Sequence, residues 1–254
     1  MGNRRHFMHS MMACAVALSA AVSFATAAHA AGEPLRVATD ATFAPMEFVE
    51  NGKRTGFDVD LIEALARTMG RPVEWTDIDF KGLVPGLISR RFDVAISGIY
   101  ITEERKKVVD FTVPYYHGGL VALVKQGNTA IKTPADLNGK KVSVQVGTKS
   151  VNYLRENYPK VERVEVEKNN EMFNLVEIGR ADAAVTGRPA AAYYVKARPG
   201  LRLVEPALTT EEYGIAVRRD QPELTKALNA ALEKIKADGT YDQIVKKWFG
   251  ATAK

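Results

Sequence analysis

A short segment, Asp93 to Arg105, carries the residues best suited to bind an anion. Three apolar residues after Asp93 are typical of a buried strand, and Ser97 and Gly98 form a turn behind it. A helix is expected to begin at Thr102, where backbone N–H groups point outward without partners. Arg105 adds a planar guanidinium that suits a carboxylate with two hydrogen bonds. Taken alone, the segment is equally consistent with a helix cap and a surface arginine.

The first 30 residues have the pattern of a secretory signal peptide. Arg4 and Arg5 precede an apolar run over 11–26, and an A-x-A triplet typical of cleavage sites ends at Ala30. The run is short for a membrane-spanning helix and ends in small residues. We therefore expect cleavage after Ala30 rather than a membrane anchor. Because no later stretch is apolar over a spanning length, we expect a soluble, exported chain in a bacterial periplasm.

Residue counts exclude several kinds of chemistry. Cys14 is the only cysteine and lies in the predicted signal, and His117 is the only histidine after it. Disulfides, thiolate catalysis and Cys-ligated zinc are therefore excluded in the mature chain. A His-based metal site or a Ser-His-Asp triad is hard to build with one histidine, and no metal or cofactor is predicted. The formal charge of +5 falls to about +3 without the signal, and acidic and basic residues are interspersed. No nucleic-acid partner is expected.

Strands and helices alternate along the first part of the remaining chain. The expected order is strand 35–39, helix 56–69, strand 73–78, helix 82–90 and strand 94–96. Such alternation favours a parallel sheet covered by helices. This alternation of strands and helices ends at a long apolar strand over 120–124.

A second unit of the same kind follows that strand. It comprises strand 141–146, helix 150–157, strand 164–166, helix 170–178, strand 181–186 and a helix after Pro189. An apolar strand near 213–217 precedes two last helices, over 223–237 and 241–248. The pattern predicts an α/β fold of two similar lobes, joined by a two-strand hinge with a ligand cleft between them. Lobe 1 is expected over 31–120 plus 216–254, and lobe 2 over 121–215.

Several motifs together resemble the periplasmic solute-binding proteins of the polar amino-acid uptake family, bacterial family 3. They cover essentially the whole mature chain: DATFAPMEF from Asp40, GFDVDL from Gly56, FKGLVPGL from Phe80, the segment 93–105, DFTVPYY from Asp110 and GTKS from Gly147. The resemblance implies a receptor of an ABC importer that closes on a polar amino acid or a related carboxylate-bearing compound. It implies a membrane permease as partner, a monomer, and no enzymatic activity.

The resemblance also implies positions for the ligand contacts. Arg105, assisted by backbone N–H groups of the turn 98–100 and of Thr148, is expected to hold the ligand's α-carboxylate. Phe43 and Phe80 correspond to aromatic walls, and Asp40 to a residue that reads a distal polar group or an ammonium. The complete expected contact set is Asp40, Phe43, Phe80, Ser97, Gly98, Tyr100, Arg105, Gln145, Thr148, Lys149, Thr186 and Gly187.

Two positions depart from the family pattern. Tyr100 stands where many members have threonine, and Thr186-Gly187 stand where the family usually has an aspartate for the α-ammonium. Either Asp40 or Glu47 takes that role, or the ligand lacks a free α-ammonium. In the second case Lys149 and Arg188 would favour a more anionic or opine-like ligand, unless both point to solvent. The substitution Gly187→Asp is designed to separate these cases.

An enzyme is the alternative function. The same fold hosts exported dehydratases that act on cyclohexadienyl compounds such as prephenate or arogenate. Their chemistry needs a general acid above the leaving hydroxyl. The only acids expected near the cleft are Asp40 and Glu47, which disfavours this alternative without removing it.

Overall fold

The computed structural model describes residues 32–250. The predicted signal peptide, with Cys14 and the cleavage site after Ala30, lies outside these residues. Within them, no helix has the length and apolar character needed to cross a membrane. The same residues contain no cluster of His, Cys, Asp and Glu that could hold a metal ion.

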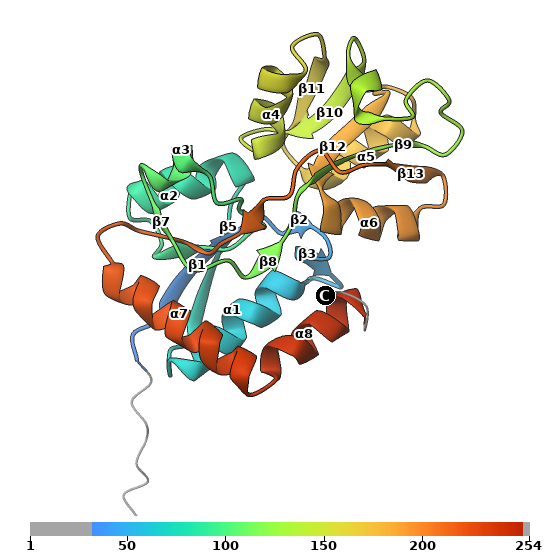
Figure 1. Cartoon of the computed structure of the whole chain (residues 1–254). Helices are drawn as coiled ribbons and strands as arrows, with labels where there is room; N and C mark the ends of the chain where they lie inside the picture. Colours follow the sequence, from blue (N-terminus) through green and yellow to red (C-terminus); the bar gives the residue numbers. More distant parts are fainter. Residues whose placement is uncertain (1–31, 251–254) are drawn as a thin grey trace, which may run out of the picture. The chain divides into compact units, whose positions relative to one another are not determined.

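Two five-stranded mixed sheets form the framework (Figure 1). The first has the strand order β5-β1-β6-β15-β7 and the second β11-β10-β12-β9-β13. The strands of the first sheet are β1 (Leu35–Thr39), β5 (Val73–Asp77), β6 (Val94–Ala95), β7 (Asp110–Phe111) and β15 (Ala216–Val217). Those of the second are β9 (Leu120–Lys125), β10 (Lys141–Gln145), β11 (Glu162–Val166), β12 (Ala183–Gly187) and β13 (Leu201–Val204).

Helices cover both faces of the first sheet. They are α1 (Phe57–Thr68), α2 (Leu83–Ile88), α7 (Pro222–Ala237) and α8 (Thr240–Phe249). Side chains alternate across a strand, so Val37 of β1 shares a core with Leu61 of α1 and Leu228 of α7. Its neighbour Ala38 packs in a different core, with Leu83 of α2. We call this sheet and its helices the first lobe.

The second lobe repeats the arrangement with α4 (Lys149–Asn157), α5 (Asn169–Glu177) and α6 (Arg188–Ala197). Its strand β9 is the long apolar run that the sequence placed over 120–124. Val121 and Leu123 pack with Met172 of α5, whereas Leu120 and Ala122 face the other core. Burial on both faces explains why this strand is apolar throughout.

Two short strands carry the chain between the lobes. β8 (Tyr116–His117) lies between the strands of the first sheet and β9, and β14 (Glu212–Tyr213) precedes the return to β15. The two pair antiparallel, with Tyr116 opposite Tyr213. A two-strand connection of this kind is the predicted hinge between two lobes. The exact lobe boundaries, 120/121 and 215/216, stay a prediction.

The expected helices and strands are present, with additions that the periodicity did not indicate. These are a three-stranded meander of β2 (Thr42–Phe43), β3 (Glu47–Glu50) and β4 (Lys53–Thr55), together with β7, β8 and β13. The strands expected to form parallel sheets do so: β1 runs parallel to β5 and β6, and β10 runs parallel to β11 and β12. The antiparallel strands of both sheets were not predicted. β15 runs antiparallel to β6 and β7, and β9 runs antiparallel to β12 and β13, because the chain enters and leaves each lobe along these strands.

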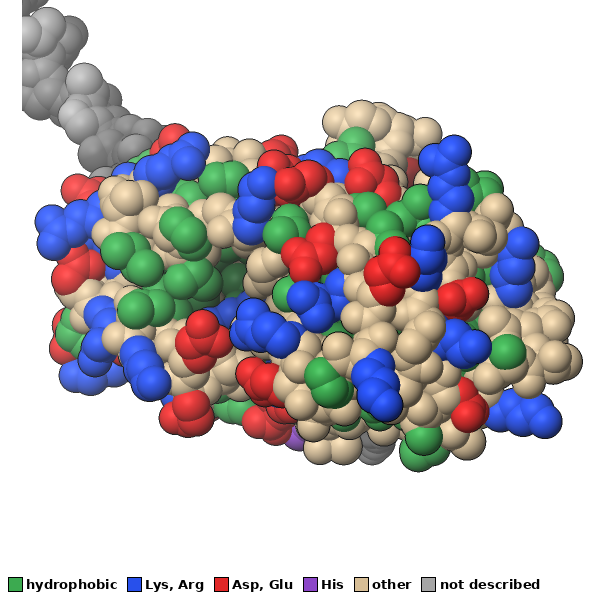
Figure 2. Space-filling model, turned by 90° about the horizontal axis from the view of Figure 1, so that it is seen from above, with side chains coloured by type: hydrophobic (Ala, Val, Ile, Leu, Met, Phe, Trp, Pro, Cys, Tyr) green, Lys and Arg blue, Asp and Glu red, His purple; other side chains and the backbone are tan. Residues whose placement is uncertain are grey.

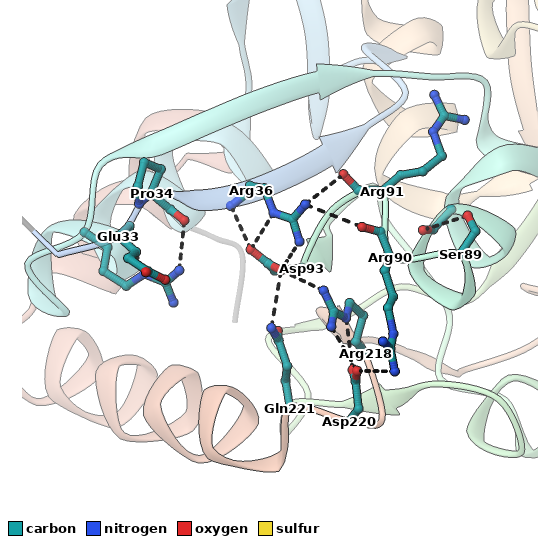
Figure 3. A network of polar contacts seen from close by, with 12 residues as sticks. Glu33, Pro34, Arg36, Ser89, Arg90, Arg91, Asp93, Arg218, Asp220 and Gln221 are labelled. Carbon is teal, nitrogen blue, oxygen red and sulfur yellow. Dashed lines mark hydrogen bonds and ion pairs between the residues drawn. The ribbon is translucent and has the colours of Figure 1, made fainter.

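A polar cluster around Asp93 fastens the returning chain to the first sheet (Figure 3). The Asp93 carboxylate accepts from Arg36 Nη2 at 2.6 Å, from Arg218 Nη1 at 3.2 Å and from Gln221 Nε2 at 3.3 Å. Burial raises the pKa of Asp93, but its hydrogen bonds and the charge of Arg36 outweigh that effect and lower it. The segment before β6 is thereby tied to β1 and to the start of α7.

Candidate ligand-binding site

A cavity lies between the two lobes and brings together ten of the twelve predicted contact residues. From the first lobe it is lined by Phe43, Phe80, Ser97, Gly98 and Tyr100, and from the second by Gln145, Thr148, Lys149, Thr186 and Gly187. We call it the first cavity. Its volume of about 30 Å³ has room for roughly two or three water molecules, at ~10–15 Å³ each. A larger ligand therefore requires the walls to move apart.

The turn after β6 is held by buried carboxyl groups behind it. Gly98 has a positive φ of 51°, and its N–H donates to Asp58 Oδ2 at 2.8 Å. Ser97 Oγ donates to Glu47 Oε1 at 2.6 Å. A Cβ on Gly98 would lie 2.6 Å from Phe43 Cε1, so the aromatic ring rests directly on the glycine. The predicted positions of Phe43, Ser97 and Gly98 at one rim agree with this geometry.

Glu47 and Asp58 form a carboxyl pair that is completely buried. Burial, and then the charge of Asp58, raise the pKa of Glu47 well above its usual range. Burial likewise raises the pKa of Asp58 to about 6, although Tyr115 Oη donates to it at 2.9 Å. Burial therefore favours the protonated form of Glu47, which lies behind the turn and does not line the first cavity.

Asp40 follows β1 but does not line the first cavity either. Its oxygens accept from Gln145 Nε2 at 2.6 Å, from Thr42 Oγ1 at 3.0 Å and from the Phe80 N–H at 3.1 Å. Lys168 Nζ lies 3.6 Å away. Burial raises the pKa of Asp40 against the opposing charge of Lys168. The bond to Gln145 makes Asp40 a contact between the lobes.

The second lobe contributes the N-terminal end of α4. Thr148, Lys149 and Ser150 line the first cavity there, where backbone N–H groups have no partners within the helix. Thr148 uses its hydroxyl to donate to Gln145 O at 2.7 Å. The ammonium group of Lys149 pairs with the carboxylate of Glu211, so its charge is already partnered.

Asn169 lines the first cavity although it was absent from the predicted contacts. It is the first residue of α5 and only 2% exposed. Its Nδ2 donates to Thr186 Oγ1 at 3.2 Å, while its Oδ1 has no hydrogen-bond partner among the described residues. Its position three residues after the end of β11 was the available signal, because parallel strands end at one edge of a sheet.

Two tyrosine side chains occupy the space beside Gly187. A Cβ on Gly187 would lie 2.1 Å from the Tyr213 hydroxyl oxygen and 3.3 Å from that of Tyr100. Tyr100 Oη donates to Gly119 O at 2.7 Å, and Tyr213 Oη donates to Tyr100 Oη at 3.3 Å. Burial raises the pKa of both phenols, so they are neutral. An aspartate at position 187 has no room, and Gly187→Asp therefore does not test the ligand class.

Arg105 lies beside a second cavity of about 190 Å³, which shares Phe80 with the first. Thr102 Oγ1 caps the expected helix by accepting from the Arg105 N–H at 3.2 Å. That helix, α3 (Glu103–Lys106), has only four residues, so the side chain is the group that can bind an anion.

The guanidinium of Arg105 is partnered only by carbonyl groups. It donates to Tyr100 O at 2.9 Å and to Gly147 O of the second lobe at 3.3 Å, and its Cζ lies 5.5 Å from the centroid of the Phe80 ring. No acidic residue in the described part of the chain forms an ion pair with it. Desolvation lowers the pKa of Arg105 to about 10, which leaves it protonated at neutral pH.

Arg188 is the other basic residue that the sequence suggested for an anionic ligand, and it lies on the second lobe away from both cavities. Its guanidinium pairs with Glu205 at 2.7 Å, and it does not line either cavity. The face seen in Figure 2 shows basic and acidic side chains interspersed, without an extended area of one sign. That distribution agrees with the sequence, in which no basic tract was found.

Ionic contacts also join the two lobes. Lys168 Nζ pairs with Asp79 at 2.5 Å, and Lys81 Nζ pairs with Glu167 at 2.6 Å. Both pairs are partly exposed, so each contributes little to stability on its own. With the buried Gln145–Asp40 bond, they hold the lobes together around the cavity.

Comparison with known proteins gives consistent results. The sequence profile of the bacterial extracellular solute-binding proteins, family 3, matches residues 35–251. The chain is 35% identical over 238 residues to ABC transporter arginine-binding protein 1 of Escherichia coli (strain K12), covering 91% of this chain and 97% of that protein.

Two solved structures extend the likeness to the fold. An ancestral arginine-binding protein bound to arginine is 46% identical with a TM-score of 0.83, over 86% of this chain and 99% of that one. The ancestral amino acid-binding protein AncCDT-1, a precursor of cyclohexadienyl dehydratase, is 44% identical with a TM-score of 0.80, over 86% and 96%. With the two-lobed fold and the cavity between the lobes, these matches show that the chain belongs to the bacterial extracellular solute-binding proteins of family 3.

Proposed function

We propose that this protein is the solute receptor of an ABC importer. It binds a polar amino acid or a closely related carboxylate-bearing compound between the lobes and delivers it to a membrane permease. The observation that carries the proposal is the first cavity, whose polar wall is built from the strand ends of both lobes. The similarity to arginine-binding relatives supports the ligand class but not a particular amino acid.

The carboxylate of the ligand is proposed to meet Arg105. The present acceptors of its guanidinium are the neutral carbonyls of Tyr100 and Gly147. A carboxylate forms stronger, charge-assisted hydrogen bonds with a guanidinium than a carbonyl does. A ligand would therefore draw the side chain past the Phe80 ring towards the first cavity, whose wall includes Lys149 at the start of α4.

The aromatic and hinge elements give the receptor its clamp. Phe43 and Phe80 flank the first cavity from the first lobe, and apolar parts of the ligand are proposed to lie between them. β8 and β14 join the lobes, so the lobes can separate and reclose at that hinge. A ligand that touches both lobes shifts the population towards the closed form.

Export, localisation and assembly complete the proposal. The predicted signal peptide and the extracellular character of the family support a periplasmic protein that is cleaved after Ala30. We propose a monomer that docks on its permease through surfaces of both lobes. A dehydratase activity is not proposed, because no carboxyl group of the described residues lines the first cavity to act as a general acid.

The proposal is tested by a thermal-shift screen of the purified protein after unfolding and refolding to remove carried-over ligand. The panel contains standard amino acids, opines, dicarboxylates and prephenate. A compound at 100 times its dissociation constant adds about 2.7 kcal/mol of stability. A panel in which no small carboxylate stabilises the protein would overturn the proposed function, and turnover of prephenate would replace it with the enzyme.

The variant Arg105→Ala tests the proposed carboxylate contact. Removing one partner of a buried ion pair costs about 3–5 kcal/mol, so binding of any hit should weaken by roughly 150- to 4,000-fold in calorimetry. Arg188→Ala is the matched control, because that guanidinium pairs with Glu205 outside both cavities. Equal affinities of the two variants would remove Arg105 from the site.

A further inference from the structure

The wall of the first cavity is not built to receive a positive charge. None of its fourteen lining residues is acidic. Lys149 is the one basic residue among them, and its ion-pair partner Glu211 does not line the cavity. An ammonium group entering this space would lose its water without meeting a free carboxylate, which strongly disfavours its burial.

The acids behind the wall do not supply the missing charge. Both oxygens of Asp40 already accept hydrogen bonds, and Lys168 stands at 3.6 Å. Glu47 is fully buried, and its Oε1 accepts from Ser97 Oγ. The Ser97 side chain therefore separates the Glu47 carboxyl group from the ligand space.

The opposite wall is neutral as well. The hydroxyl of Tyr213 occupies the space beside Gly187 and is bonded to the hydroxyl of Tyr100, which in turn donates to Gly119 O. The two phenols form a closed hydrogen-bond chain that ends on a backbone carbonyl. This wall therefore contains two tyrosine hydroxyl groups, but no anionic group that could pair with an ammonium.

One group in the cavity wall is still without a partner. Asn169 Oδ1 is buried and accepts no hydrogen bond from the described residues, while Asn169 Nδ2 is held by Thr186 Oγ1 at 3.2 Å. A buried carbonyl oxygen in this state gains by accepting one hydrogen bond from a ligand. An uncharged donor such as a hydroxyl supplies that bond and does not need a counter-charge.

We propose that the first cavity selects a small carboxylate whose second polar group is an uncharged donor, such as a 2-hydroxy acid, and rejects the matching compound with a free ammonium. The inference rests on the proposed function and narrows its ligand class. The carboxylate faces Arg105 and the first N–H groups of α4, and the hydroxyl donates to Asn169 Oδ1. The amino-acid relatives do not predict this choice; it follows from the neutral wall.

The test uses matched pairs that differ only in the substituent: L-lactate and L-alanine, L-glycerate and L-serine, L-malate and L-aspartate, L-2-hydroxyglutarate and L-glutamate. Calorimetry on the refolded protein should give at least one hydroxy acid that binds roughly 100-fold tighter than its amino partner. Amino acids that bind as tightly as their hydroxy partners would overturn the inference and leave the proposed function standing. If no pair member and no compound of the wider carboxylate screen binds, both are overturned.

Two variants of neighbouring residues test the assigned acceptor. Asn169→Asp places a carboxylate in the wall and should reverse the preference, raising amino-acid affinity and lowering hydroxy-acid affinity by about tenfold or more each. Asn170→Asp adds the same charge at an exposed position of the same helix and should leave both affinities unchanged. An unaltered preference in a folded Asn169→Asp protein would contradict the role of Asn169. If that protein does not fold, the pairs measured on the unsubstituted protein still decide the inference.

Discussion

At Gly147 the backbone of the second lobe lies close to the backbone of the first lobe, so a substitution there tests closure of the lobes. It has a φ of +76°, and a Cβ there would lie 2.9 Å from both Cα and Cβ of Lys81 in the first lobe. Carbon atoms in favourable contact are about 3.5–4.0 Å apart. An alanine at 147 would therefore force the lobes apart at this point, by roughly 0.6–1.1 Å relative to that separation.

The expected loss of ligand affinity follows from the free-energy cost of this overpacking. Overpacking of this kind costs about 1–3 kcal/mol, and it falls on the closed form alone. Separation would also weaken the bond between Arg105 Nη2 and Gly147 O, which is already 3.3 Å long. Because only the closed form holds the ligand between both lobes, Gly147→Ala should weaken binding by about 5- to 150-fold.

The assay compares Gly147→Ala with Gly139→Ala. Gly139 also lies in the second lobe with a φ of +73°, but nothing is within 4 Å of its Cβ position. Both variants carry the strain of a positive φ, and only Gly147→Ala meets the other lobe. Calorimetry with the tightest compound of the screen measures affinity, and thermal unfolding without ligand measures the shared strain. Equal ligand affinities of the two variants would refute the reasoning from closure.

Two further predictions concern stability and pH. Asp93→Asn should destabilise the protein by about 1–3 kcal/mol at pH 7. The control Asp77→Asn, which removes a partly exposed partner of Arg54, should cost at most about 1 kcal/mol. Because the pKa of folded Asp93 is lowered, its contribution to stability is present above the unfolded pKa of about 3.9 and is lost as pH falls through the folded pKa, so the stabilities of the Asp93→Asn and unsubstituted proteins should begin to converge below about pH 4. Glu47 has the opposite pH dependence, because its pKa is raised in the folded protein. Its burial beside Asp58 therefore lowers the free energy of unfolding progressively as pH rises above the unfolded-state pKa of about 4.3. Glu47→Gln should therefore unfold at a higher temperature than the unsubstituted protein at pH 8 and lose that advantage at pH 4.5, and a constant difference across this range would contradict the assignment.

The family resemblance, together with the positions of strand ends in the sequence, was enough to name most of the residues that line the cavity. Ser97 follows β6, and Gln145 and Thr186 lie at the ends of β10 and β12. Parallel strands present their carboxyl ends at one edge of a sheet, so residues after apolar runs gather there whatever the order of the strands. Asn169 obeys the same rule after β11, and was missed because its asparagine in a polar run resembles an ordinary helix start.

What remained hidden depends on side chains that meet across long sequence distances. Tyr213 reaches Gly187 only because β14 pairs with β8 at the hinge, and neither short strand has a periodicity that indicates pairing. Arg105 points towards the second cavity because its guanidinium meets carbonyls of both lobes, a contact that exists only when the lobes are closed. The absence of an aspartate at Thr186-Gly187 was visible in the sequence, whereas the tyrosine hydroxyl that fills the space beside Gly187 comes from the hinge. The character of this wall therefore depends both on a motif position and on a residue that only the fold brings next to it.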